Sequence, residues 1–227
     1  MIDAAWARLL SLAVHEFRTP VTVVGGYVRL LLSERAGPLA PGQRRILEEI
    51  QKSCGRLSTL LAELGDLASL ETGKAVLQRG RVELGRLVDE VVASAPAAAN
   101  QPPLRLVGAT PELVLDGDQS RLRGALAALV QAIRREVGDA ETEVIVDRTL
   151  RERGAERAAW IAIGPAAAVE RLRGARAEEL APFDEFRGGC GLSLPLARRV
   201  VELHGGRLLA PPGEQQRAAV AVELPLG

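Results

Sequence analysis

Apolar residues in the first third of the chain recur at steps of three and four, which is the spacing of one helical face. This pattern predicts a first helix from about Asp3 to Glu34, ended by Gly37 and Pro38. The apolar period continues past Pro20, so we expect that proline to bend the helix rather than end it. The apolar positions are Trp6, Leu9, Leu10, Ala13, Val14, Phe17, Val21, Val24, Val28, Leu31 and Leu32.

A second helix is expected from Pro41 to about Gly73, with apolar residues in alternating steps of four and three, as in a coiled-coil seam. Two long antiparallel helices cannot bury both seams alone. Pairing of two chains into a four-helix bundle is the simplest solution, so the pattern predicts a homodimer. The alternative is a monomer in which the seams pack on the C-terminal half. The seam residues are Ile50, Cys54, Leu57, Leu61, Leu64 and Ala68.

From Arg79 onward, short runs typical of strands alternate with helical ones. We expect two domains, residues 1–75 and 79–227, the second a two-layer α+β sandwich with its helices on one face of the sheet. The expected strands are 81–84, 104–107, 112–115, 141–150, 158–163, 207–209 and 218–224, with a hairpin turn at 151–154. The expected helices are 85–94, 118–137, 166–173 and 192–203.

Composition excludes several classes of function. The 227 residues include 29 basic and 29 acidic ones, and no basic run is interleaved with aromatic residues, so we expect no nucleic-acid partner. No apolar window is long enough to span a bilayer and the start lacks the basic residues of a secretion signal, which predicts a cytoplasmic chain. Cys54 and Cys190 lie far apart and His15 and His204 are the only histidines, so no metal site is predicted.

The candidate chemistry lies in the first helix, where His15 is followed directly by Glu16 and, one turn later, by Thr19. An imidazole is nucleophilic when one ring nitrogen is unprotonated, and Glu16 can accept the proton of the other nitrogen. The Thr19 hydroxyl can orient a water molecule. His15 taken alone is an ordinary exposed histidine.

Residues 15–20, His-Glu-Phe-Arg-Thr-Pro, resemble the phosphoacceptor box of sensor histidine kinases. The resemblance implies that His15 carries a phosphoryl group with the help of Glu16, and that Glu16 and Thr19 assist dephosphorylation of a response regulator. It also implies a receiver domain as partner. From their placement below His15 we expect the residues that contact this receiver to be Arg18, Val21, Val24, Gly25, Tyr27 and Val28.

Residues 79–226 resemble the ATP-binding domain of the same kinases. The best match is a glycine loop at 188–194, Gly-Gly-Cys-Gly-Leu-Ser-Leu, followed by a helix and by His204-Gly205-Gly206. For His204 itself we expect only a helix-terminal role.

The departures from this family are more informative than the matches. Ala162 stands where the family has the adenine-binding Asp, and Gln131 or Ala132 stands where it has the magnesium-binding Asn. Only Arg187 separates Phe186 from the glycine loop, where the family has a lid. We therefore expect a degenerate pocket with no bound cofactor, formed by Gln131, Ala132, Ala162, Gly164, Gly189 and Gly191.

Three functions remain open. The first is a dimeric histidine phosphotransferase or response-regulator phosphatase that uses His15 without autokinase activity. The second is a sensor histidine kinase that autophosphorylates His15 through a divergent ATP and Mg²⁺ site. The third is a scaffold that only docks partners.

Overall fold

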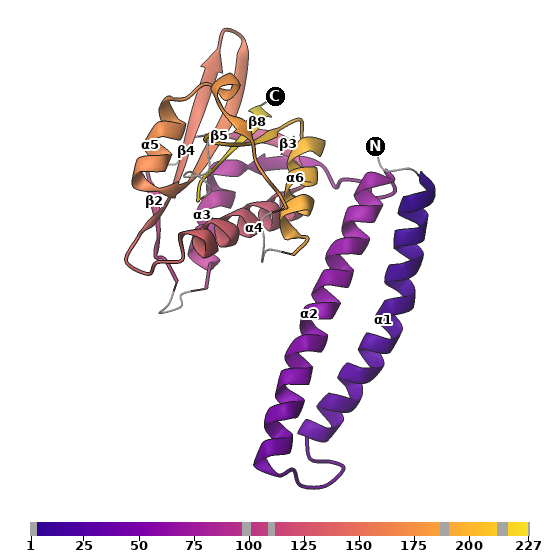
Figure 1. Ribbon diagram of the computed structural model, residues 1–227. Helices are drawn as coiled ribbons and strands as arrows, with labels where there is room; N and C mark the ends of the chain where they lie inside the picture. The colour runs from indigo at the N-terminus through magenta and orange to yellow at the C-terminus, as the bar shows by residue number, and fades with distance from the viewer. Residues whose placement is uncertain (1–3, 97–100, 109–111, 187–190, 213–217, 227) are drawn as a thin grey trace. The chain divides into compact units, whose positions relative to one another are not determined.

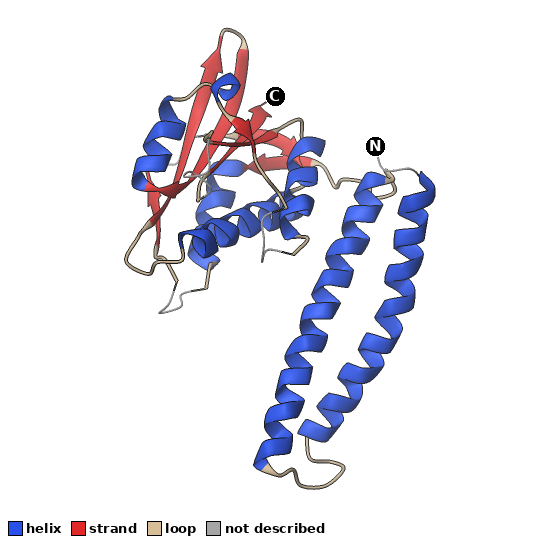
Figure 2. Cartoon of the chain, in the orientation of Figure 1, coloured by secondary structure: helices blue, strands red, loops and turns tan. Residues whose placement is uncertain are grey.

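The computed structural model describes residues 4–96, 101–108, 112–186, 191–212 and 218–226. The chain divides into two compact units, Met1–Val76 and Leu77–Gly227. The first is helical and the second contains the strands (Figure 2).

The first unit is a hairpin of two long helices, α1 (Ala4–Leu32) and α2 (Pro41–Glu71), as predicted (Figure 1). Pro20 lies inside α1, which continues through it. Because proline has no N–H, the carbonyl one turn earlier, that of Glu16, loses its helical partner. Pro41 begins α2, and Gly73, with φ of 65°, follows its last turn in the left-handed conformation that ends many helices.

The described strands of the second unit form a six-stranded sheet in the order β2-β4-β5-β8-β7-β6 and a separate pair, β1 with β3. β2 runs parallel to β4, and the other neighbours are antiparallel. The strands are β1 (Gly80–Glu83), β2 (Leu104–Val107), β3 (Val114–Gly117), β4 (Val144–Arg153), β5 (Glu156–Pro165), β6 (Ala181–Pro182), β7 (Arg207–Ala210) and β8 (Val220–Leu226). The helices are α3 (Leu84–Ser94), α4 (Gln119–Val137), α5 (Ala166–Gly174), the short 3-10 helix η1 (Ala177–Glu179) and α6 (Ser193–Leu203).

The expected placement of all helices on one sheet face is wrong for α5. Trp160 and Ala162 of β5 pack with Leu172 of α5 in one buried cluster, whereas Ile161 and Ile163 point to the opposite face and are also buried. Figure 1 shows α5 on one side of the sheet and α3 and α4 on the other. The apolar run of β5 is unbroken because both faces of this strand are covered, so apolar residues need not alternate with polar ones along it.

Arg151 of β4 holds α5 in this position. Its guanidinium lies 3.3 Å from the centre of the Trp160 ring and donates hydrogen bonds to the carbonyls of Leu172, Arg173 and Ala175 at 2.8 to 2.9 Å. These carbonyls belong to the C-terminal end of α5, where a cation is favourable.

Several strand boundaries differ from the prediction. The β4–β5 hairpin turns at Gly154, with φ of 60°, because charged residues continue the strand pairing as Glu152 with Arg157 and Arg153 with Glu156. β3 begins two residues later than expected. β6 and η1 were not predicted, because two or three residues carry no detectable period.

A buried node joins three distant segments of the second unit. Asp118, 5% exposed, caps α4 by accepting the N–H of Arg121 at 3.1 Å, and it also accepts the N–H of Gln78 at 3.0 Å. The Asp118 N–H donates to Nε2 of His204 at 2.8 Å, while Nδ1 of His204 lies 2.7 Å from the Val200 carbonyl. Nε2 of His204 thus accepts from Asp118 while Nδ1 faces the Val200 carbonyl, and the residue lies at the end of α6 as expected.

This node predicts a pH-dependent stability. Burial raises the pKa of Asp118, but the N–H groups of Arg121 and Gln78 and the charge of Arg121 outweigh it and hold the pKa below the ordinary 3.8. The carboxylate therefore stabilises the fold above that pH, and this contribution is lost as the pH falls through the lowered folded-state pKa.

Asp118→Ala should lower the free energy of unfolding of the second unit by about 1–2 kcal/mol at neutral pH. In urea titrations monitored by circular dichroism, its difference from wild type should shrink as the pH falls below 3.8. Asp116→Ala, at the exposed neighbouring carboxylate, is the control. An equal, pH-independent effect of both variants would contradict the assignment.

Candidate functional site: the groove beside His15

His15 lies at the edge of the α1 face that contacts α2, beside a residue that faces α2 directly. Val14 is 4% exposed, and its Cγ1 would be 3.5 Å from a Cβ placed on Gly65 of α2, whereas His15 is exposed. The one-residue step between them corresponds to about 100° around the helix. Packing of Val14 on α2 therefore fixes His15 at the border between the helix interface and solvent.

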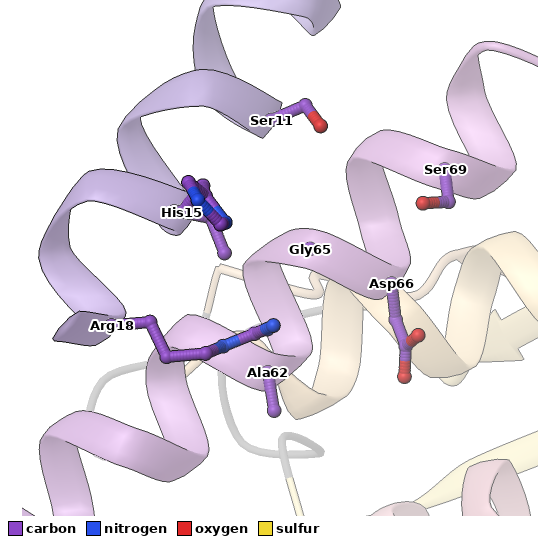
Figure 3. Close-up of a pocket in the computed structure, with 8 residues that line it drawn as sticks. Ser11, His15, Arg18, Ala62, Gly65, Asp66 and Ser69 are labelled. Atoms are coloured by element: carbon purple, nitrogen blue, oxygen red, sulfur yellow. The ribbon is translucent and has the colours of Figure 1, made fainter. Parts of the chain in front are cut away.

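An open groove of about 360 Å³ runs between the two helices at this position. His15 points into it, and Arg18 extends from α1 toward α2 (Figure 3). The lining residues are Ser11, Val14, His15 and Arg18 of α1 and Ala62, Gly65, Asp66 and Ser69 of α2.

The α2 residues were missed by sequence reasoning. The only available signal was their place beside the predicted seam, where Gly65 directly follows Leu64. A glycine inside a long helix costs about 1 kcal/mol relative to alanine. A Cβ on Gly65 would make only ordinary contacts, 3.5 Å from Cγ1 of Val14 and 3.9 Å from Nη2 of Arg18, so only a side chain larger than alanine would crowd these two residues.

Glu16 and Thr19 are both exposed on α1, outside the lining of the groove. Both are accessible to a partner that approaches α1 from solvent. The neighbouring Thr22 differs from Thr19, because its hydroxyl donates to the Arg18 carbonyl at 2.8 Å.

The expected receiver-contact residues divide into two groups. Val24 and Tyr27 are 46% and 65% exposed, and Arg18 is exposed as well. Val21 and Gly25 are half-buried, and a Cβ on Gly25 would lie 3.8 Å from Cβ of Cys54 on α2. Val28 is only 5% exposed, so it offers a receiver little contact surface. Its apolar side chain belongs to the packed side of the hairpin.

The expected nucleotide-pocket residues are not brought together on one face. Ala162 has no exposed surface and lies in the cluster with Ala168 and Val169 of α5. Gln131, half-buried, and Ala132, 2% exposed, lie on α4, which covers the other face of the sheet.

The glycines of this expected pocket have separate surroundings. A Cβ on Gly164 would lie 2.9 Å from Cβ of Ala219, so the residues just before β8 approach it closely. Gly191 has φ of 64°, in the turn before α6, and Gly189 lies outside the described residues.

These residues do not fit a magnesium nucleotide. Methyl groups at Ala162 and Ala132 carry no ligand atom for a purine or a cation, and both are buried. Magnesium prefers oxygen ligands in near-ideal octahedral geometry. Among Gln131, Ala132 and Ala162, only the side-chain amide of Gln131 could supply such an oxygen.

Comparison with known proteins agrees with the phosphoacceptor motif. Residues 5–73 match the His Kinase A (phospho-acceptor) domain. The chain is 27% identical over 239 residues to histidine protein kinase DivJ of Caulobacter vibrioides, with 99% of this chain and 38% of the relative covered. It is 29% identical over 233 residues to sensor protein GacS of Pseudomonas syringae pv. syringae, with 96% and 25% covered. The chain thus spans well under half of these relatives.

Solved structures share the fold. Full-length ShkA in complex with AMPPNP has a TM-score of 0.69 at 21% identity, over 96% of this chain and 45% of that one. Histidine kinase ThkA in complex with response regulator protein TrrA has a TM-score of 0.53 at 19% identity, over 97% and 61%. Since 96% and 97% of this chain are covered, the likeness extends over both its helical hairpin and its α/β unit. In the part of this chain that the structure describes, no helix is long and apolar enough to cross a membrane.

Proposed function

Since this chain belongs to the two-component histidine kinase family, we propose that it is a histidine phosphotransferase and response-regulator phosphatase that acts through His15 without autokinase activity. The observation that carries the proposal is a contrast between the two units. His15, Glu16 and Thr19 are exposed on α1, whereas Ala162 is an apolar residue buried under α5.

Phosphotransfer requires a nucleophile that a partner can reach. The unprotonated ring nitrogen of His15 attacks the phosphorus of an aspartyl phosphate on the receiver. The N–P bond forms as the P–O bond to the receiver breaks, and the aspartate leaves as a carboxylate. The proton on the other ring nitrogen passes to the Glu16 carboxylate. The same step in reverse returns the phosphoryl group to a receiver.

Dephosphorylation uses the same turn of α1. The Thr19 hydroxyl positions a water molecule whose oxygen bonds to phosphorus as the receiver aspartate leaves. Glu16 accepts the proton that this water loses. This reaction forms no bond to His15, so Thr19 substitution separates it from phosphotransfer.

A second copy of the chain is the proposed partner of the hairpin. Trp6, Phe17 and Leu57 remain 55%, 61% and 48% exposed in a single chain, on helices whose apolar seams continue beyond the α1–α2 contact. Exposed apolar area of this extent is typical of an interface. Two hairpins that pair through these residues form a four-helix bundle.

Thr19→Ala should slow dephosphorylation of a phosphorylated receiver by about tenfold or more, the loss expected for one hydrogen bond to a charged reacting group. His15→Ala should abolish transfer of radiolabel to this protein. Thr22→Ala is the matched control, because the Thr22 hydroxyl is occupied by the helix backbone. If wild-type protein neither accepts nor drains label from any cognate receiver, the proposal fails.

Calorimetric titration with ATP and Mg²⁺ should give no saturable binding at nucleotide concentrations up to about 1 mM, which corresponds to a binding free energy weaker than about −4 kcal/mol. The rival function, an active autokinase, is favoured by the similarity to a structure solved with AMPPNP. It requires saturable binding and an acid-labile, base-stable phosphohistidine at residue 15. Either result would replace the proposed function with that one.

Leu57→Glu should convert the protein to a monomer, because two charges would face each other across the apolar seam of a dimer. Sedimentation velocity measures the change. Thr59→Glu, two residues on and about 200° around α2, is the control and should remain dimeric. A wild-type protein that sediments as a monomer at micromolar concentration would contradict the predicted dimer.

A further inference from the structure

Arg18 lines the same groove as His15, and no carboxylate of the described residues forms an ion pair with it. It follows His15 by three residues and therefore lies on the same side of α1. Its side chain extends toward α2 near Ala62 and Gly65 (Figure 3). Within the described ranges, its guanidinium has no carboxylate oxygen within 4.0 Å, although Asp66 lines the same groove.

The path of Arg18 across the helix pair depends on Gly65. A Cβ on Gly65 would lie 3.9 Å from Nη2 of Arg18 and 3.5 Å from Cγ1 of Val14, which are both ordinary contacts. Alanine therefore fits at this position. A longer side chain would extend into the space that Arg18 crosses.

We propose that Arg18 binds the phosphoryl group carried by His15, with Gly65 of α2 leaving the space in which the guanidinium lies. The inference rests on the proposed phosphotransfer function and adds to it a second residue of the site. A guanidinium offers a fork of N–H donors that matches the oxygens of a phosphoryl group. In the sequence, Arg18 was expected only to contact the receiver.

The charge change at His15 explains the need for such a residue. Phosphorylation attaches to the His15 ring a group that carries close to two negative charges above a pH of ~6. Asp66 lines the same groove and would repel this group. Arg18 supplies a compensating positive charge from the same face of α1.

The experiment uses the whole chain and no receiver, so that docking cannot contribute. Phosphoramidate is the donor: its P–N bond breaks as the N–P bond to His15 forms, and ammonia leaves. Phosphorus NMR then follows the phosphohistidine signal as a function of pH. In Arg18→Gln, the pKa of the phosphoryl group should rise by about 0.5 or more relative to wild type, because a nearby cation favours the dianion.

Three further variants separate the causes. Arg29→Gln removes a charge from the same helix away from the groove and should leave this pKa unchanged. Gly65→Ala should behave as wild type, whereas Gly65→Leu should raise the pKa as Arg18→Gln does. Circular dichroism establishes that each variant retains its helices.

The outcomes distinguish this proposal from the function on which it rests. If wild-type protein forms no phosphohistidine at residue 15, the proposed phosphotransfer fails and the role of Arg18 fails with it. If phosphohistidine forms but its pKa is the same in Arg18→Gln and wild type, only the role of Arg18 is overturned. Arg18 would then remain a predicted receiver contact.

Discussion

Two helices packed side by side can bury only the strip of each that faces the other, and this constraint governs the first unit. Val14 and Val28 occupy that strip, while Phe17 and Leu57 remain largely exposed. His15 follows Val14 directly and so stands at the border of the strip. The accessibility of the histidine and the exposed apolar seams therefore have one geometric origin.

In the second unit both faces of an element must be covered, because its central strand β5 is apolar on both faces. α5 covers the face that carries Trp160 and Ala162, and Arg151 secures its C-terminal end by binding the last carbonyls of the helix. In this arrangement the position of Ala162 is part of the apolar core and carries no polar group. The fold shared with the solved structures is retained while that position serves as core.

The sequence predicted elements best where a long period or a strong terminator was present. Pro41 and Gly73 delimit α2 close to the expected positions, and the period through Pro20 correctly indicated an uninterrupted helix. Side-chain direction was harder. The placement of α5 depends on which face of the sheet the chain crosses after Pro165, and the burial of Val28, which was expected both on the apolar face of its helix and among the receiver contacts, depends on α2. Gly65 and Asp66 belong to the groove only through contacts between segments about 50 residues apart, which no local pattern contains.

The Asp118 node also determines where the chain can be divided. One Asp118 oxygen is satisfied by the N–H of Gln78, and Arg79 binds the carbonyl of Leu203 at the end of α6. Cleavage between Gly73 and Leu77 would release the second unit with all of these bonds intact. Cleavage beyond Gln78 would leave a buried carboxylate oxygen without its donor. A single backbone amide thus marks the shortest N-terminal limit of an independently folding fragment.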